Sequence, residues 1–222
     1  VRGPDRGGCA GVCPAGHRDF SLLRSIHVDA VFVPTAEMIY GSDFQSWVEL
    51  KDLPLLYEGG SRPGHFRGVS TVVAILFNLV SPDFAIFGEK DFQQLRIIET
   101  MVKELKFNLS VIRGPIVRES DGLAMSSRNV RLSERDREIA PQIYKALSLA
   151  QEAVKGSSMK AQDIEALASD LLSKFSEIEI DYLKLVRESD LQPAERSSSD
   201  TRILFAGILG GIRLIDNLAI QS

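Results

Sequence analysis

A strand–helix–strand pattern over residues 84–114 constrains the fold of this chain more than any other feature. FAIF at 84–87 is a short apolar run typical of a buried strand, and residues 91–106 then place apolar side chains at helical spacing. LSVIRG at 109–114 supplies a second strand. Strands joined in this way pair in parallel, and ligands of such α/β sheets bind beyond the carboxyl ends of the strands. We therefore predict an open parallel sheet with a ligand site near residue 88.

Upstream of this unit the sequence predicts one further strand and one long helix. VDAVFVP at 28–34 is rich in β-branched residues and ends at a proline, which predicts a strand. Residues 65–80 are apolar enough for a buried helix, and Ser-Pro-Asp at 81–83 then breaks the pattern. Residues 1–18 are rich in Gly, Arg, Pro and Cys and have no period of either kind. We interpret them as disordered or foreign to the fold.

Downstream of this unit the sequence predicts a smaller α+β half. The expected elements are a helix to about Val154 opened by Ser133 and Asp136, which resemble a capping box, a second helix at about 160–175, a strand at 178–186, and a β-hairpin around Gly210-Gly211. We place the domain boundary near Gly114-Pro115. This gives an α/β domain at 19–114 and a smaller α+β domain at 115–222.

The charge of the chain argues against nucleic-acid and membrane partners, and its cysteine content argues against a metal site or a disulfide framework. Lys and Arg number 26 against 30 Asp and Glu, a net charge of −4, which provides no basic field for nucleic acid or an anionic membrane. The longest apolar stretch, at 72–80, is too short to span a bilayer, and we find no signal peptide, so we expect a cytoplasmic protein. Cys9 and Cys13 are the only cysteines, and a single C-x₃-C pair is a poor metal site and a weak disulfide framework.

The tetrapeptide Gly88-Glu89-Lys90-Asp91 follows the first strand of this unit, where a helix begins. Unpaired backbone N–H groups and the helix dipole favour an anion there. Gly88 lets the backbone approach a phosphate closely, and Lys90 adds a positive charge beside it. In the alternative interpretation Asp91 is simply an N-cap and Lys90 is solvated. The tetrapeptide alone does not decide between the two.

A second polar cluster, SDGLAMSSRN, occupies residues 120–129. Two adjacent hydroxyls, an arginine and an amide next to a flexible Asp-Gly turn can bind a polyphosphate through charge-assisted hydrogen bonds. The alternative is a serine-rich surface loop without a ligand. Both interpretations remain open on these residues alone.

Four motifs taken together resemble the pantothenate synthetase family, ligases that make pantothenate from pantoate, β-alanine and ATP. They are RPGHFRGV at 62–69, GEKDxQQ at 88–94, VRExDGLAMSSRN at 117–129 and RLIDN at 213–217. The resemblance runs from about residue 19 to the end, with the motifs in the family's order. It implies a Rossmann-like nucleotidyltransferase domain with a smaller C-terminal lid domain, Mg²⁺ accompanying ATP, and a homodimer.

The resemblance also implies roles for individual residues. The residues expected to bind ATP are Gly88, Glu89, Lys90, Asp91, Val117, Met125, Ser126, Ser127 and Arg128. Lys90, Ser126 and Arg128 are expected to be catalytic, and the loop that contains the last two is expected to close over ATP. Gln94 and His65 are expected to bind pantoate, although His65 capping the following helix is an equal alternative. Asp19 aligns with a carboxylate near magnesium in the family, and we assign no metal ligands.

The sequence departs from the family at its start. The family opens with an M-G-x-L-H-x-G-H loop whose histidines bind ATP, and this chain contains no such motif; His17 is not preceded by a second histidine at that spacing. We therefore expect the chain as given to lack the family's opening βαβ unit and to be inactive alone. Two alternatives to an enzyme of this family are a catalytically dead nucleotide-binding remnant and, less favoured, another adenylyltransferase of the superfamily.

Overall fold

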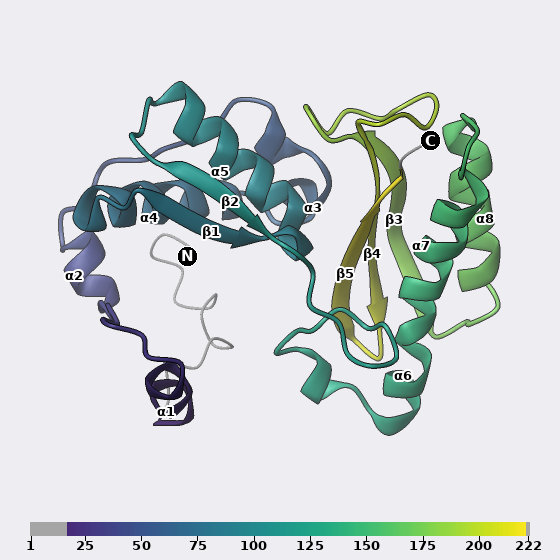
Figure 1. Cartoon of the computed structure of the whole chain (residues 1–222), viewed down its shortest axis with the longest axis horizontal. Coiled ribbons are helices and arrows are strands. Elements are labelled where there is room, and N and C mark those ends of the chain that lie inside the picture. Colours follow the sequence, from purple (N-terminus) through teal and green to yellow (C-terminus); the bar gives the residue numbers. More distant parts are fainter. Residues whose placement is uncertain (1–16, 221–222) are drawn as a thin grey trace. The chain divides into compact units, whose positions relative to one another are not determined.

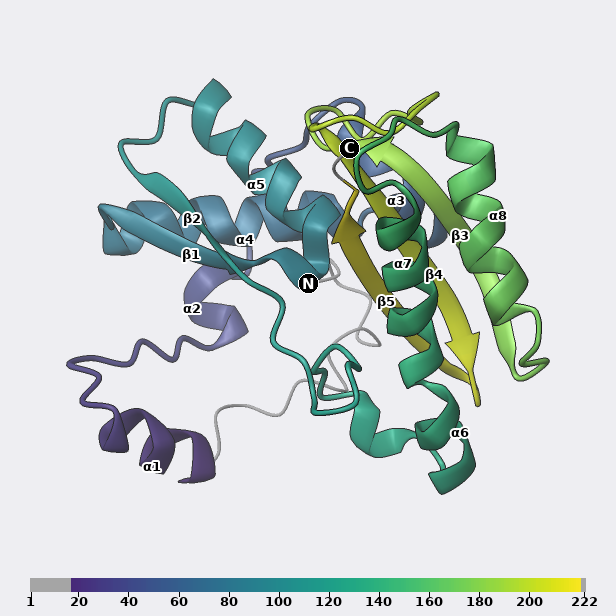
Figure 2. The ribbon, with the colours of Figure 1, turned by 45° about the vertical axis from the view of Figure 1, so that its right-hand side comes forward.

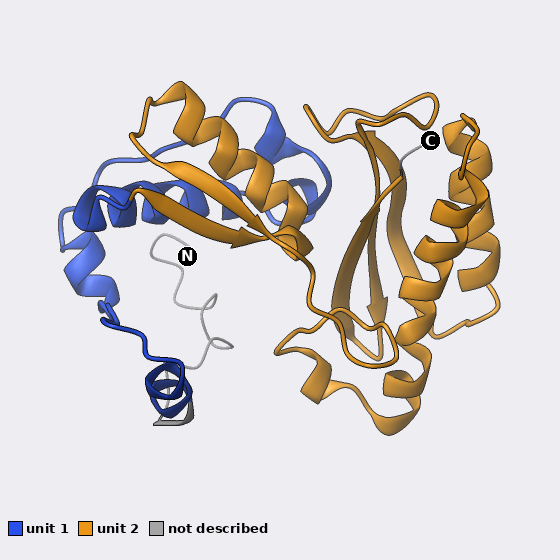
Figure 3. Cartoon of the chain, in the orientation of Figure 1, with its two compact units in different colours: residues 1–82 blue, residues 83–222 orange. Residues whose placement is uncertain are grey.

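The computed structural model describes residues 17–220 and divides the chain into two compact units between Pro82 and Asp83 (Figure 1, Figure 3). The interpretations of Cys9, of Cys13 and of residues 1–16 fall outside the described residues. The predicted domains 19–114 and 115–222 do not coincide with these two units and stay a prediction. Each unit is described below by itself.

The first unit is helical over its described residues. Its helices are α1 (His17–Ser25), α2 (Ala36–Tyr40), the 3₁₀ turn η1 (Leu53–Leu55), α3 (Tyr57–Ser61) and α4 (His65–Val80). The bounds of α4 match the predicted helix, and its buried face contains Phe66, Val69, Val73 and Phe77. Ser81 ends α4 in the left-handed conformation, with its N–H donating to the Phe77 carbonyl at 2.8 Å.

Residues 28–34 form no strand, so that prediction is wrong. β-Branched residues favour a strand only where a second strand supplies partners for the backbone, and no described residue pairs with this segment in a ladder. Val31, Phe32 and Val33 are 44%, 53% and 49% exposed. The residue types of this segment suit a strand. They do not determine whether a second strand is present to pair with it.

The second unit begins with the predicted strand–helix–strand pattern. β1 (Phe84–Gly88) pairs in parallel with β2 (Ser110–Gly114), and between them lie the 3₁₀ turn η2 (Glu89–Asp91) and α5 (Phe92–Glu104). The parallel pairing is confirmed. The expected burial of β1 is not confirmed, because the side chains of Phe84 and Ile86 are 65% and 71% exposed. Successive side chains of a strand point to opposite faces, and α5 packs against only one of them (Figure 2).

A three-stranded antiparallel sheet covered by helices forms the rest of this unit. Its elements are η3 (Asn129–Arg131), α6 (Glu134–Ile139), α7 (Pro141–Ala153), α8 (Ala161–Leu172), β3 (Ile178–Arg187), β4 (Thr201–Leu209) and β5 (Ile212–Ala219). The strand order is β3-β4-β5, and α7 and α8 lie on one face of the sheet (Figure 1). Fully buried apolar side chains between the helices and the sheet form the core, including Ile143, Leu147, Leu172, Leu185 and Phe205.

The predicted helix from Ser133 to Val154 is divided in two. Ser133 caps it as expected, its Oγ accepting from the Asp136 N–H at 3.1 Å. The division falls at Ala140 because Pro141, which has no N–H, occupies the first position of α7. The predicted second helix, strand and β-hairpin are confirmed, and the hairpin turns through two glycines with φ of 56° and 75°.

Candidate active site

The segment from Gly88 to Asp91 presents Lys90 at the carboxyl end of β1. The Lys90 side chain is half-buried and forms no hydrogen bond or ion pair with any of residues 17–220. At Gly88 no atom lies within 4 Å of the position that a Cβ would take, so the backbone is open to a close approach there. Asp91 occupies the N-cap position of α5, but its side chain makes no capping hydrogen bond. A simple capping role for Asp91 is therefore not supported.

Residues 117–129 fold into a tight loop. The Met125 N–H donates to the Val117 carbonyl at 2.9 Å, and the Glu119 N–H donates to the Leu123 carbonyl at 2.8 Å. The turn between them depends on Gly122, whose φ is +93° and whose position leaves no room for a Cβ, because the ring of Tyr144 lies only 2.2 Å from where it would be. The second polar cluster is thus an ordered loop with a defined turn.

Two arginines fix this loop to the rest of the unit. The Arg118 guanidinium donates to the Asp216 carboxylate at 2.7 and 2.9 Å and lies 4.0 Å from the centre of the Tyr144 ring. Arg137 donates to one carboxylate oxygen of Glu119 and one of Asp121, each at 2.6 Å. Both ends of the turn are therefore held by charged hydrogen bonds.

Hydrogen bonds from Asn129 and Arg137 lower the pKa values of the two loop carboxyls. For Glu119 the largest cause is the hydrogen bond from the Asn129 amide, at 2.9 Å, followed by that from Arg137, and both favour the charged carboxylate. For Asp121 the hydrogen bond from Arg137 is the largest cause of the lowered pKa. Both carboxyls are thus held in the charged form that Arg137 requires.

The far end of the loop is held more weakly. The Ser126 Oγ accepts from the Arg128 N–H at 3.2 Å, which closes a short turn. The Arg128 guanidinium has one hydrogen bond, a 3.4 Å contact with the Arg213 carbonyl, and the residue is exposed. Met125 and Ser127 are also exposed. Because Arg128 has one long hydrogen bond to lose, its guanidinium can move to an anion at little cost.

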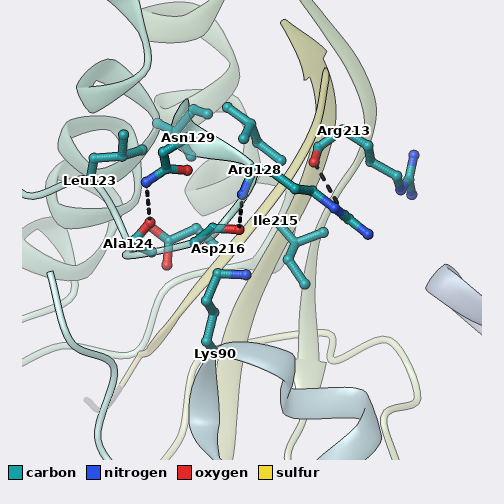
Figure 4. A pocket seen from close by; sticks show the side chains of 11 residues that line it. Lys90, Leu123, Ala124, Arg128, Asn129, Arg213, Ile215 and Asp216 are labelled. Carbon is teal, nitrogen blue, oxygen red and sulfur yellow. Dashed lines mark hydrogen bonds between the residues drawn. The ribbon is translucent and has the colours of Figure 1, made fainter. Parts of the chain in front are cut away.

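A narrow pocket in the second unit brings these segments together (Figure 4). It is lined by Lys90, Leu123, Ala124, Ser126, Arg128, Asn129, Ile143, Arg213, Leu214, Ile215 and Asp216. Its free space is about 10 Å³, roughly that of one water molecule. The three residues expected to be catalytic therefore line one pocket, and a nucleotide phosphate needs the loop to shift before it can enter.

The other residues expected to bind ATP do not line this pocket. Gly88, Glu89 and Asp91 lie beside it in sequence, and Val117, Met125 and Ser127 lie on the loop. Val117 is 64% exposed. The pocket thus contains part of the expected set, and the other members lie on the two segments that form it.

The residues expected to bind pantoate lie on different units. Gln94 is half-buried in the first turn of α5, and its amide makes no hydrogen bond with a described residue. His65 begins α4 in the first unit, where Gly64 occupies the N-cap position, so His65 is not the N-cap residue. Asp19 lies in the first turn of α1. The roles of these three residues stay predictions.

Sequence reasoning assigned no role to the two polar residues that end RLIDN. Asp216 and Asn217 are 4% and 1% exposed on β5. Asp216 holds Arg118, and the Asn217 amide donates to the carbonyls of Glu89 and Lys90 at 3.0 Å each. An Asp-Asn pair flanked by apolar residues within a strand is the sequence signal that could have indicated a buried polar contact.

The described residues contain neither a metal-binding cluster nor a membrane-spanning helix. Among residues 17–220 no group of three or more His, Cys, Asp or Glu side chains is arranged to hold a metal ion. Over the same residues no helix combines the length and the apolar character needed to cross a membrane.

Known protein sequences match this chain over most of its length. The sequence profile of the family described as Pantoate-beta-alanine ligase matches residues 15–219. The chain is 46% identical to the pantothenate synthetase of Desulfatibacillum aliphaticivorans, over 92% of this chain and 73% of the relative. It is 45% identical to the pantoate–β-alanine ligase of Schizosaccharomyces pombe, over 90% of this chain and 71% of the relative.

Solved structures give the same result. The crystal structure of pantothenate synthetase from Thermus thermophilus superposes with a TM-score of 0.92 at 40% identity, covering 99% of this chain and 79% of the other. The pantoate–β-alanine ligase of Francisella tularensis, complexed with Beta-gamma ATP and β-alanine, gives a TM-score of 0.71 at 30% identity, covering 92% and 70%. The chain therefore belongs to the pantoate–β-alanine ligase family.

Proposed function

We propose that this chain catalyses the ATP-dependent condensation of pantoate with β-alanine to pantothenate, a step toward coenzyme A. The observation that carries the proposal is that Lys90, Ser126 and Arg128 line one pocket in a chain 46% identical to a pantothenate synthetase. A structural relative binds an ATP compound and β-alanine, which are the substrates of this reaction other than pantoate. These comparisons favour an active enzyme over a nucleotide-binding remnant.

The first step joins pantoate to the nucleotide. A carboxylate oxygen of pantoate attacks the α-phosphorus of ATP, the bond from that phosphorus to the bridging oxygen breaks, and pyrophosphate leaves with the electron pair. Negative charge gathers on the departing phosphates. The Lys90 ammonium, which has no ion-pair partner among the described residues, neutralises that charge. Gly88 leaves the backbone accessible to the phosphates, as its open Cβ position supports.

The second step transfers the pantoyl group. The neutral amine of β-alanine attacks the acyl carbon of pantoyl adenylate, the carbon–oxygen bond to AMP breaks, and the amine loses a proton as the amide forms. AMP leaves with both electrons of the broken bond. Arg128 and Ser126 hold the phosphate during both steps, and the weak hydrogen bond of Arg128 supports its movement onto a bound phosphate.

The remaining expected site residues have binding roles in this proposal. Glu89, Asp91, Met125 and Ser127 contribute to the ATP site, and Val117, which is 64% exposed, contacts the adenine. Gln94 and His65 bind pantoate. The amide of Gln94 is free of hydrogen bonds to described residues, so it is available to the hydroxyls and carboxylate of the acid.

Mg²⁺ accompanies ATP in this proposal. Magnesium in nucleotide sites is held by phosphate and water oxygens with one or two carboxylates, and the exposed Asp91 next to Lys90 offers such a carboxylate. When bound, the ion neutralises phosphate charge. We also propose a cytoplasmic homodimer, on the basis of the family resemblance, which mass photometry of the purified protein tests.

The assay measures AMP and pantothenate formed from ATP, pantoate and β-alanine with Mg²⁺. It is run on this chain and, in parallel, on residues 19–222 joined to the N-terminal segment of a family member. Pantothenate from the joined form supports the proposed function, and its absence from both forms contradicts it.

A further inference from the structure

Asn217 on β5 holds the backbone that carries Lys90. Its Nδ2 lies 3.0 Å from the carbonyl oxygen of Glu89 and 3.0 Å from that of Lys90. Asn217 is only 1% exposed. A buried amide that donates to two consecutive carbonyls fixes the path of the backbone between them, and neither carbonyl can exchange this partner for water without moving.

The orientation of this amide is itself determined by its neighbours. The Asn217 Oδ1 accepts from the Arg202 guanidinium at 2.5 Å, while the backbone N–H of Asn217 donates to the Asp216 carboxylate at 2.7 Å. A guanidinium has only donors, so it requires the amide oxygen to face it and directs the nitrogen toward the Lys90 segment. Arg202 is 6% exposed and lies 4.1 Å from the centre of the Phe92 ring, at the start of α5.

The residue next to Asn217 holds the other phosphate-binding segment. Asp216 pairs with Arg118, and Arg118 also donates to the Gly122 carbonyl at 3.0 Å, at the turn of the loop. Two consecutive residues of one strand therefore determine where the Lys90 segment and the 117–129 loop lie. A shift of either residue changes the separation between Lys90 and that loop.

We infer that Asn217 is a positioning residue for Lys90, one that sets the location of the ammonium group relative to the departing phosphates. The inference rests on the role of Lys90 in the proposed function. A purely structural Asn217 would instead stabilise the sheet without a specific effect on Lys90. The two cases differ in how a change at Asn217 combines with a change at Lys90.

The test is a double-mutant cycle of Asn217→Asp and Lys90→Ala, measured as pantoate-dependent pyrophosphate release by the form active in the assay above. Asp keeps the size of Asn and an acceptor for Arg202 but loses both N–H donors. We expect the rate to fall roughly 10–100-fold, since misplacement of a charged group by about 1 Å can cost that much. In the Lys90→Ala background the same change should lower the rate less than about 3-fold, because non-additivity marks residues that act together.

Thr201→Val is the matched control. Thr201 is 1% exposed and its hydroxyl bonds to the carbonyls of Ser198 and Ile220, so this change also removes buried hydrogen bonds of the same sheet without touching residues 88–91. Its effect on rate should be the same with Lys90 present or absent. Asn217→Ser, whose shorter side chain loses both amide N–H donors and adds no charge, replaces Asn217→Asp if that variant does not fold.

If the rate effects of the two single changes simply multiply in the double variant, the inference is overturned. The role of Lys90 is then unaffected. A Lys90→Ala variant with wild-type turnover would overturn both the role of Lys90 and the inference. Equal non-additivity for Thr201→Val would also overturn it, because the coupling would then reflect general destabilisation.

Discussion

Arg118 and Asp216 form a two-point ion pair across 98 residues of sequence, with guanidinium nitrogens 2.7 and 2.9 Å from the two carboxylate oxygens. The Asp216 side chain is 4% exposed and that of Arg118 16%. The pair joins the 117–129 loop to β5, so the stability of the unit and the position of the loop depend on the same contact.

Asp216→Asn should lower the free energy of unfolding by about 3 kcal/mol, because Arg118 is left buried without its counter-charge. Urea denaturation followed by circular dichroism measures this. Asp170→Asn, an exposed change on α8, is the control and should have no measurable effect. A loss of less than about 1 kcal/mol at Asp216 would mean that the ion pair contributes little.

Gly122→Ala should destabilise the chain more than Gly156→Ala does. Both glycines have positive φ, +93° and +78°, and so share the backbone strain that an alanine introduces. Only Gly122 faces the Tyr144 ring, whereas the Cβ position of Gly156 is open. We expect an extra loss of about 1–3 kcal/mol at Gly122 from overpacking. Equal losses would mean that the ring moves aside freely.

Lys90→Ala should lower turnover about 10²–10³-fold, the usual effect of removing one preorganised group that stabilises developing charge. AMP release is measured at saturating substrates. Lys103→Ala removes an exposed lysine near the end of α5 and is the control. Turnover near that of wild type would remove Lys90 from the mechanism.

Gln94→Ala should raise the KM for pantoate at least about tenfold and leave the KM for ATP nearly unchanged. The loss corresponds to one hydrogen bond to a charged acid, about 1.5–3 kcal/mol. Steady-state kinetics with each substrate varied in turn distinguish the two constants, and Gln162→Ala on the exposed surface of α8 is the control. Equal changes in both constants would contradict a role in binding pantoate.

The stabilising effect of Arg137 should depend on pH. The pKa values of Glu119 and Asp121 lie below their ordinary 4.5 and 3.8, so the ion pairs stabilise the folded chain above these values and are lost as the pH falls through the lowered ones. The unfolding free energies of wild type and Arg137→Gln should therefore differ at neutral pH and converge below pH 3.8. The difference for Arg131→Gln should not change with pH. A constant difference for Arg137→Gln would contradict the ion pairs.

The elements that the sequence predicted correctly are those whose own residues contain the signal. α4 and α5 repeat apolar residues at helical spacing, and the hairpin of β4 and β5 turns through two glycines. The segment 28–34 was wrongly predicted because a strand also needs a partner. The prediction that β1 is buried was wrong for a related reason, because apolar side chains do not determine whether another element packs over them.

The candidate site was predictable to a similar extent. The sequence indicated Lys90 and Arg128 because polar residues follow a strand or gather in a loop, and both residues line one pocket; their roles stay predictions. The roles of Arg118 and Asn217 were missed because each depends on a contact with a residue about 100 or more positions away. The local sequence can indicate that a polar residue is buried, but it does not identify the distant residue that it contacts.

The hydrogen bonds from Asn217 to Glu89 and Lys90 cross 128 and 127 positions of sequence, which has a consequence for synthesis of the chain. The ribosome releases the Lys90 segment long before it makes β5. Until β5 emerges, the carbonyls at 89 and 90 lack the two hydrogen bonds that Asn217 donates to them. Lys90 therefore reaches its final position late in translation, after the helices that precede β5 have been made.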